Sequence, residues 1–175
     1  TINFDDKPIG TDARTAYASQ GVQFSRDDQG FVPVYNWGNL PHVGSSGIHV
    51  LSSGGMGHGS SYNLTATFST PINQFAAYFG NDGVGLNATM SLINSANTVI
   101  GSYVLPLNGN ISVDQYFGLR NADPFVKVRI EYEPKGYGVV LDDLSFGFAN
   151  CTPPRVLQNG SCVSQVPPVS VLNLA

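Results

Sequence analysis

Short runs in which apolar and polar residues alternate recur along the whole chain, with turn residues between them. The runs are rich in Val, Ile, Phe, Tyr and Thr, and their period of two is typical of half-buried β-strands. They cover residues 1–5, 21–25, 31–35, 47–51, 61–68, 74–80, 87–94, 99–105, 115–120, 126–131 and 138–148. One helical turn is expected around residues 12–20. Many short strands predict an all-β fold, an antiparallel sandwich, jelly roll or barrel.

The composition supports a single domain with a packed core. The chain has 175 residues, 42% of them hydrophobic, and a mean hydropathy of -0.01. Charged residues make up 11%, against roughly 25% in ordinary soluble domains. Gly, Asn, Ser and Thr supply the polarity instead. This balance is typical of an extracellular β-protein with a neutral, hydrogen-bonding surface.

The charge pattern excludes some partners. The net charge is -4, and the eight Lys and Arg residues form no cluster. Nucleic acids and anionic membranes need a basic patch, so neither is expected as a partner. No apolar run approaches the roughly 20 residues of a membrane-spanning helix. The first residue reads like the start of a mature chain after removal of a signal peptide. We therefore expect a secreted protein, extracellular or at the cell surface.

Both cysteines lie close together near the end of the sequence. Cys151 and Cys162 enclose a polar, Pro-containing loop, which predicts a local disulfide in an exported protein. Two free thiols or half of a metal site are the alternatives. The predicted organisation is a β-sandwich over residues 1–149, a disulfide-closed loop over 150–163 and a Pro-containing tail over 164–175. The uncharged, β-prone tail either packs on its own domain or adds as a strand to a neighbouring subunit.

Five asparagines stand in the sequence pattern of an N-glycosylation site. They are Asn63, Asn87, Asn110, Asn150 and Asn159. A chain this rich in Asn, Ser and Thr would contain two or three such patterns by chance. The excess suggests export, and all five are candidate glycosylation sites.

Several phrases of the sequence resemble a broad set of secreted jelly-roll domains. They are the opening INFDD…GT…Y…GVQFS, the closing VKVRIEY…YGVVLDDLSFG, and the middle TFSTPINQFAAYFGN and YFGLRNADPFVKVRIEY. The set includes MAM-type adhesion domains and sandwich modules of exported bacterial proteins, among them carbohydrate-binding ones. The resemblance spans residues 1–148 and implies a jelly-roll sandwich. The chain lacks the cysteines that MAM domains carry in their body.

The alternation of side chains along the first and last strands places aspartates on core-facing rows. If residues 1–6 form a strand, Ile2, Phe4 and Asp6 share one face. In the last strand, Asp142 shares a face with Val140 and with the alternate residues that follow it. A buried carboxylate must be hydrogen-bonded, paired or bound to a metal.

The jelly-roll resemblance implies a structural Ca²⁺ bound by carboxylates of the first and last strands, which often lie close together in such domains. Calcium takes six to eight oxygen ligands. The candidate ligands are Asp5, Asp6, Asp142 and Asp143, with Asp27 or Asp28 as further candidates. The alternative is that these are turn and capping residues.

Catalytic patterns are missing from the sequence. The three histidines show no HExxH spacing, and no G-x-S-x-G motif occurs. The only glutamates, Glu131 and Glu133, lie two residues apart, so on a strand they would point the same way and would not bracket a sugar. We therefore expect no enzyme.

The best candidate for a ligand contact is the loop that contains Tyr35, Asn36 and Trp37. A Trp beside Tyr and Asn can stack on a sugar ring while the amide hydrogen-bonds to hydroxyl groups. A single Trp that is part of the core is the alternative.

These observations favour a non-enzymatic structural or adhesive subunit of an extracellular fibre or matrix, assembled in part through its C-terminal strand. Its partners would be further copies of the chain or other extracellular proteins. The alternative is a lectin-like carbohydrate-binding module with structural calcium. A hydrolase has little support.

Overall fold

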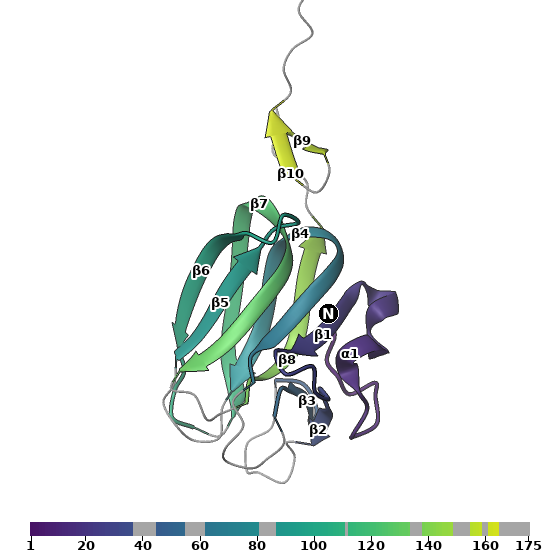
Figure 1. Cartoon of the computed structure of the whole chain (residues 1–175). Helices are drawn as coiled ribbons and strands as arrows, with labels where there is room; N and C mark the ends of the chain where they lie inside the picture. Colours follow the sequence, from purple (N-terminus) through teal and green to yellow (C-terminus); the bar gives the residue numbers. More distant parts are fainter. Residues whose placement is uncertain are drawn as a thin grey trace, which may run out of the picture.

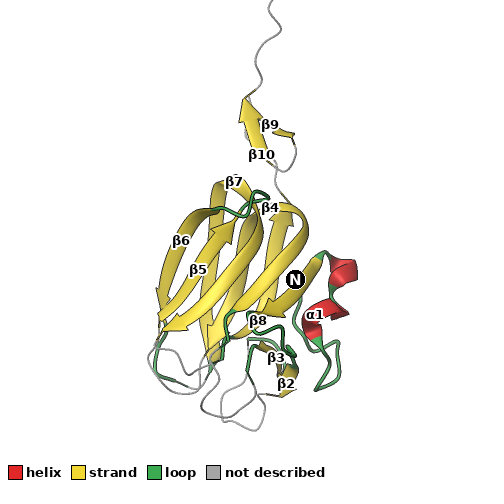
Figure 2. Ribbon diagram, viewed as in Figure 1, coloured by secondary structure: helices red, strands yellow, loops and turns green. Residues whose placement is uncertain are grey.

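The computed structural model describes residues 1–36, 45–54, 62–80, 87–110, 112–133 and 138–148, and the backbone of 155–158 and 161–164. This part of the chain is almost entirely strand and loop (Figure 2). One short helix, α1 (Ala13–Ala16), leads into the 3₁₀ turn η1 (Ala18–Gln20) and confirms the helical turn expected there. No helix among the described residues is long and apolar enough to cross a membrane.

Eight antiparallel strands form the main sheet, and β9 and β10 form a separate hairpin. The strands are β1 (Val22–Arg26), β2 (Val34–Asn36), β3 (His49–Ser52), β4 (Leu64–Gly80), β5 (Asn87–Ile93), β6 (Val99–Pro106), β7 (Val113–Glu133), β8 (Val140–Phe148), β9 (Arg155–Gln158) and β10 (Ser161–Ser164). The predicted all-β antiparallel fold is confirmed. The strand predicted over residues 31–35 begins later than expected, at Val34.

Two long strands, β4 and β7, run through both layers of the sandwich. Their antiparallel pairing extends from Leu64 opposite Ile130 to Gly80 opposite Val113. The first half of β4 and the second half of β7 lie with β1, β5 and β6. The other halves lie with β8, β3 and β2. Figure 1 shows β5, β6 and the second half of β7 side by side in one layer.

Prolines mark the places where these long strands change layer. Pro71 lies in the middle of β4 and Pro124 in the middle of β7, and the register between the strands shifts between Thr67 and Gln74. A proline cannot donate to the ladder, so it is tolerated at such irregularities. The sequence pattern predicted two separate strands around each proline, one before it and one after it. The structure corrects this, because each pair is one strand that continues through the irregularity.

One hydrophobic core lies between the two layers. It takes alternate residues from both halves of β4, including Ala66 and Phe79, and also Met90 of β5 and Ile130 of β7. A second, small cluster of Val50, Val113 and Val140 packs with two half-buried tyrosines on the other side of the β3–β8–β4–β7 layer. That layer is therefore partly apolar on both faces.

The predicted first strand is not a regular strand in the structure. Ile2 forms an isolated bridge with Leu144, in which each backbone N–H donates to the carbonyl of the other, at 2.7 and 2.9 Å. The chain then turns at Phe4, whose φ is 60°. This turn ends the alternation, so Ile2, Phe4 and Asp6 do not share a strand face. The first segment nevertheless lies beside the last strand of the sandwich, as expected for a jelly roll.

The last strand of the sandwich also departs from strict alternation. The register of β8 against β4 shifts between Ser145, opposite Ala76, and Asp142, opposite Tyr78. Asp143, with φ of 48°, lies in this bulge. A bulge adds one residue and inverts the phase. The single face predicted to run from Val140 to Phe148 is therefore wrong, since Leu141 and Leu144 both enter the core.

Beyond the sandwich, the backbone forms a short hairpin in which β9 pairs with β10 (Figure 1). Cys162 lies in β10, whereas Cys151 lies outside the described residues. The disulfide and the closed loop over 150–163 therefore stay predictions. The tail beyond Ser164 is likewise outside the described residues.

Candidate functional site

The outer face of strands β7, β4 and β8 is hollowed into a groove of about 580 Å³, which we call the trough. It is lined by Gln74, Phe75, Ala76, Tyr116, Gly118, Leu119, Arg120, Ser145, Phe146 and Gly147. These three strands are neighbours in the sheet, so the outward side chains stand in rows across them.

The register explains the hollow. The middle row consists of Gly118, Ala76 and Ser145, which are opposite one another in the ladder. Arg120 and Gln74 form the row on one side. Successive outward residues on a strand lie about 7 Å apart, and neighbouring strands about 4.8 Å. Small residues in the middle therefore leave a floor between taller walls.

Tyr116 lines the opposite side of the trough, and Tyr78 packs beside it. Tyr78 lies opposite Tyr116 in the ladder, and their ring centroids are 5.2 Å apart in an edge-to-face arrangement. Tyr78 also packs against the small valine cluster. Because Tyr78 is held by these contacts on one side, it supports Tyr116 from the edge of the trough.

The ring of Tyr116 lies over Gly118. A Cβ added at Gly118 would meet the Tyr116 hydroxyl oxygen at 2.9 Å and the ring carbons at 3.1 and 3.2 Å. Only a residue without a side chain leaves room for the ring in this position. The Tyr116 residue stays 60% exposed. The result is an aromatic ring supported from below whose outer face is open to solvent.

Polar groups stand at the other end of the trough. Arg120 and Gln74 are both exposed, and the Gln74 side chain lies across Gly147, with its Oε1 3.2 Å from where a Cβ would be. In the middle row, the Ser145 hydroxyl shares a hydrogen bond with the Thr1 hydroxyl at 2.8 Å. The trough therefore combines one aromatic wall with donors and acceptors, which is the mixture found in sites for small polar ligands.

The predicted calcium ligands divide into two groups. Asp5, Asp142 and Asp143 all accept hydrogen bonds from the segment 45–49. Asp5 Oδ1 accepts from the backbone N–H groups of Ile48 and His49, at 3.2 and 3.1 Å.

The two neighbouring aspartates of β8 hold the beginning of this segment. Asp142 Oδ2 accepts from the Ser46 backbone N–H at 3.2 Å. Asp143 accepts from the hydroxyl groups of Ser45 and Ser46. Gly47 fits here because its φ is 63° and a Cβ would lie 2.2 Å from an oxygen of Asp5.

Asp142 is completely buried. Burial raises the pKa of its carboxyl to about 7, and the nearby charges of Asp143 and Asp5 raise it as well. The backbone N–H groups of Asp143 and Ser46 act in the opposite direction. Asp142 therefore binds a proton far more readily in the folded chain than in the unfolded one.

Asp6 is directed elsewhere. It accepts a hydrogen bond from the Tyr17 hydroxyl at 2.9 Å and pairs with Lys7 at 3.2 Å. Burial, and then the Asp6 carboxylate, raise the pKa of Tyr17. Of the four proposed ligands, three thus converge and Asp6 does not.

The described residues contain no group of three or more His, Cys, Asp or Glu side chains arranged to hold a metal ion. Donors from segment 45–49 occupy oxygens of all three converging carboxylates, which is the turn-holding role weighed as the alternative. In this structure the three carboxylates hold the segment 45–49. The structural Ca²⁺ stays a prediction.

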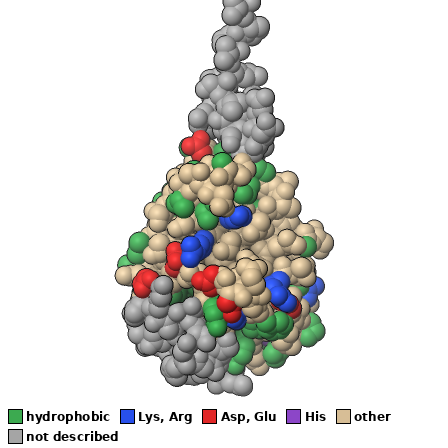
Figure 3. All heavy atoms as spheres, in the orientation of Figure 1, with side chains coloured by type: hydrophobic (Ala, Val, Ile, Leu, Met, Phe, Trp, Pro, Cys, Tyr) green, Lys and Arg blue, Asp and Glu red, His purple; other side chains and the backbone are tan. Residues whose placement is uncertain are grey.

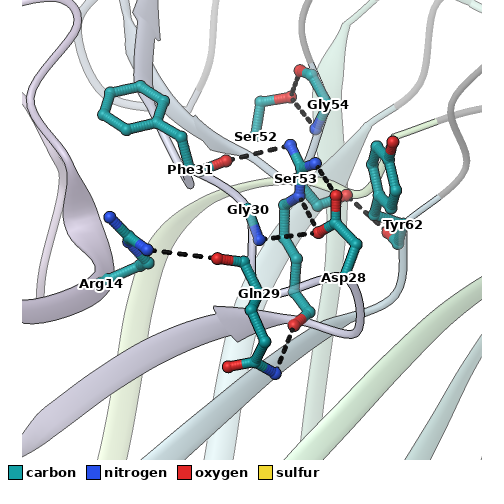
Figure 4. A network of polar contacts seen from close by, with 10 residues as sticks. Arg14, Asp28, Gln29, Gly30, Phe31, Ser52, Ser53, Gly54 and Tyr62 are labelled. Carbon is teal, nitrogen blue, oxygen red and sulfur yellow. Dashed lines mark hydrogen bonds and ion pairs between the residues drawn. The ribbon is translucent and has the colours of Figure 1, made fainter.

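Of the further candidates, Asp28 belongs to the network drawn in Figure 4, and Asp27 accepts a hydrogen bond from the Asn63 amide at 3.1 Å. Arg26 pairs with Asp28 at 2.5 Å, donates to the Phe31 carbonyl at 3.0 Å, and lies over the ring of Tyr62 at 3.7 Å. The hydrogen bond from Arg26 lowers the pKa of Asp28 to about 2. These groups satisfy one another, so the network fixes the turn after β1.

The predicted ligand loop is only partly described. Tyr35 and Asn36 lie in β2, where Tyr35 packs against the valine cluster and Asn36 pairs with His49 in the ladder. Trp37 lies outside the described residues. The sugar platform at this loop stays a prediction.

Three of the five candidate glycosylation sites can be placed. Asn63 donates its amide to Asp27 and Glu131, both at 3.1 Å. Asn110 donates to Asp114 at 2.9 Å, and Asn87 is exposed at the start of β5. Asn150 and Asn159 lie outside the described residues. Glycosylation itself stays a prediction.

No sequence pattern predicted the trough. Its residues come from positions 74–76, 116–120 and 145–147, and none forms a known motif. The alternation Tyr116, Gly118, Arg120 is visible in the sequence, but its neighbours across the strands are set by the register.

Figure 3 shows one face of the molecule, on which acidic and basic side chains are interspersed among uncharged ones. This agrees with the low charge content and with the expected neutral surface.

Comparison with known proteins supports the fold. No family model and no curated protein matches the chain. The K2 cleaved adhesin domain of Lys-gingipain is similar with a TM-score of 0.54 and 15% identity, over 83% of this chain and 97% of that one. The arabinose-bound α-L-arabinofuranosidase MgGH51 gives 0.53 and 12% identity, over 83% of this chain.

The chain corresponds to 25% of the arabinofuranosidase, so the likeness concerns a part of that enzyme. TmCBM61, solved with β-1,4-galactotriose, gives a lower TM-score of 0.47 and 13% identity, over 85% of this chain and 100% of that one. At such identities the likeness speaks for the fold alone. The chain is an antiparallel β-sandwich.

Proposed function

We propose that this chain is a non-catalytic carbohydrate-binding module that holds a glycan in the trough. The observation that carries the proposal is the Tyr116 ring, which lies over Gly118 with its outer face exposed. The C–H faces of sugar rings pack on such aromatic surfaces, while polar groups nearby hydrogen-bond to the hydroxyls.

The shape of the trough fits this role. Its volume of about 580 Å³ falls within the roughly 300–1,000 Å³ of small-molecule sites. Beside the Tyr116 ring, Ala76 and Ser145 continue the floor across β4 and β8, which at about 4.8 Å per strand gives room for a sugar ring. Its open sides would admit a chain of sugars.

The non-catalytic part of the proposal rests on the lining. A glycosidase uses two carboxylates on either side of the bond to be cleaved, and none of the described residues that line the trough is acidic. Glu131 accepts from Asn63 and pairs with Arg129, which is on the half of β7 that belongs to the other layer. The low charge and the abundance of Asn, Ser and Thr favour an extracellular role.

This proposal takes up the second of the hypotheses drawn from the sequence. A fibre subunit assembled by strand addition depends on residues 164–175, which lie beyond the described part of the chain. The trough is by contrast lined by described residues of three neighbouring strands, and it requires no partner strand. An adhesive role remains compatible with it, since an adhesive module can attach by binding glycans.

The test is affinity electrophoresis of the full chain through gels that contain single soluble polysaccharides, both neutral and acidic. We expect retardation in at least one gel, and Tyr116→Ala should weaken binding about tenfold to hundredfold, because stacking area is lost. Phe31→Ala is the matched control, since Phe31 is an aromatic residue that is 44% exposed and lies outside the trough. Equal binding by wild type and Tyr116→Ala would show that the trough is not the site.

A further inference from the structure

We infer that the trough selects glycans that carry carboxylate groups, that is, sugars of the uronic acid class, and that Arg120 is the residue that recognises the carboxylate. The inference rests on the proposed function and adds a substrate class to it. The chain has few positive charges, with eight Lys and Arg residues in all.

Six Lys and Arg side chains lie in the described part of the chain, and five of them have partners. Lys7, Arg14, Arg26 and Arg129 form ion pairs. Lys127 donates to the Asn97 side chain at 3.1 Å. Arg120 alone among these six makes no hydrogen bond or ion pair with a described residue. No described residue therefore occupies the donors of its guanidinium, and we assign them to the ligand.

Arg120 is also the one charged residue among those described that line the trough. Its neighbours across the strands are Gln74 and Gly147, which are both neutral. In a chain with a net charge of -4, an unpaired guanidinium in a groove makes a local positive site in an acidic protein. Such a site attracts an anionic ligand more strongly than a neutral one.

Tyr116 and Arg120 lie close enough together to contact the same sugar. The Tyr116 hydroxyl lies over Gly118, so the ring extends along β7 toward Arg120. Gly118 and Arg120 are two residues apart, about 7 Å along the strand. A sugar stacked on Tyr116 thus places a ring substituent within reach of the flexible Arg120 side chain. Guanidinium forms two parallel hydrogen bonds to a carboxylate, which favours this group over a neutral hydroxymethyl group.

The experiment compares polygalacturonate with its fully methyl-esterified form, which keeps the sugar rings and removes the charge. We expect the full chain to bind polygalacturonate about tenfold to hundredfold more tightly, as for a charge-assisted pair. Arg120→Gln should abolish the difference, because the acid and the ester then meet the same neutral side chain. The preference should also weaken as ionic strength rises.

Arg129→Gln is the control, because it removes a charge from β7 outside the trough. An equal loss in Arg129→Gln and Arg120→Gln would overturn the inference in favour of a diffuse charge effect. Equal binding of the acid and the ester by wild type would overturn it as well, while the proposed function would stand. Failure to bind either form, and every other polysaccharide in the panel, would remove both.

Discussion

The two halves of β7 belong to different layers of the sandwich and present different outer surfaces. The first half exposes Tyr116, Gly118 and Arg120. The second half carries Lys127, Arg129 and Glu131 outward, half-buried and engaged with neighbours. Both halves follow the same alternation, and both pack their other side chains against one core.

The difference lies in whether the outward side chains satisfy one another. Arg129 pairs with Glu131 at 3.2 Å on its own strand. Arg120 has no acid two residues away, because that position is Gly118 on one side and Ala122 on the other. Surface ion pairs add little stability, roughly 0–1 kcal/mol, yet they neutralise the groups involved. The first half of β7 thus presents an exposed ring beside a cation that no described residue pairs with, and the proposed glycan site rests on this arrangement.

The largest effect is expected from breaking the core that both surfaces share. Phe79→Ala, in the layer of the trough, should cost about 3–5 kcal/mol of unfolding free energy. Met90→Ala, in the other layer, should cost about 2–5 kcal/mol. Both should unfold the sandwich in a single transition in denaturant, because the layers have a common core. Two separate transitions would show that the layers are independent and that the comparison concerns two units.

A smaller effect is expected at Asp142, which lies opposite Tyr78 at the end of the aromatic row. Its pKa is about 7 in the folded chain and near 3.8 in the unfolded chain. Between these values the folded state holds a proton that the unfolded state has lost, so stability falls as pH rises from about 4 to 7. The total is at most about 4 kcal/mol.

Asp142→Asn should remove this slope, and thermal unfolding across that pH range measures it. The two carboxylate oxygens accept from different groups, Oδ1 from the Asp143 N–H and Oδ2 from the Ser46 N–H. The amide removes the buried charge and keeps one of these two acceptors. An unchanged slope would show that Asp142 is not the group responsible. The same pair of proteins tests the calcium prediction: if Ca²⁺ binds here, adding it should raise the melting temperature of wild type more than that of Asp142→Asn.

The smallest free-energy change is expected from filling the trough. Gly118→Val would place atoms under the Tyr116 ring and lift it, so glycan binding should weaken about tenfold, which corresponds to roughly 1.4 kcal/mol. The melting temperature should hold, since valine suits an exposed strand position. Ser91→Val, on β5 beside Arg129, is the matched change in the other layer and should leave binding intact. Binding that survives Gly118→Val would argue against the floor as a contact surface.

The sequence by itself determined the strand character of this chain. The period-two runs predicted the antiparallel all-β fold and most strand positions, because alternation follows directly from the geometry of a strand with one buried face. The low content of charged residues predicted a neutral, hydrogen-bonding surface. The neighbourhood of the first and last segments came from the resemblance, and the bridge between Ile2 and Leu144 confirms it.

Only the tertiary structure decided which residues meet. Local alternation cannot reveal that Pro71 and Pro124 lie within single strands, nor that a bulge at Asp143 inverts the phase of β8. A shift of register by one residue moves every outward side chain to the other face. The trough requires Gly118, Ala76 and Ser145 to be opposite one another on three strands, and that alignment is fixed by pairing across the sheet, which no single segment of the sequence contains.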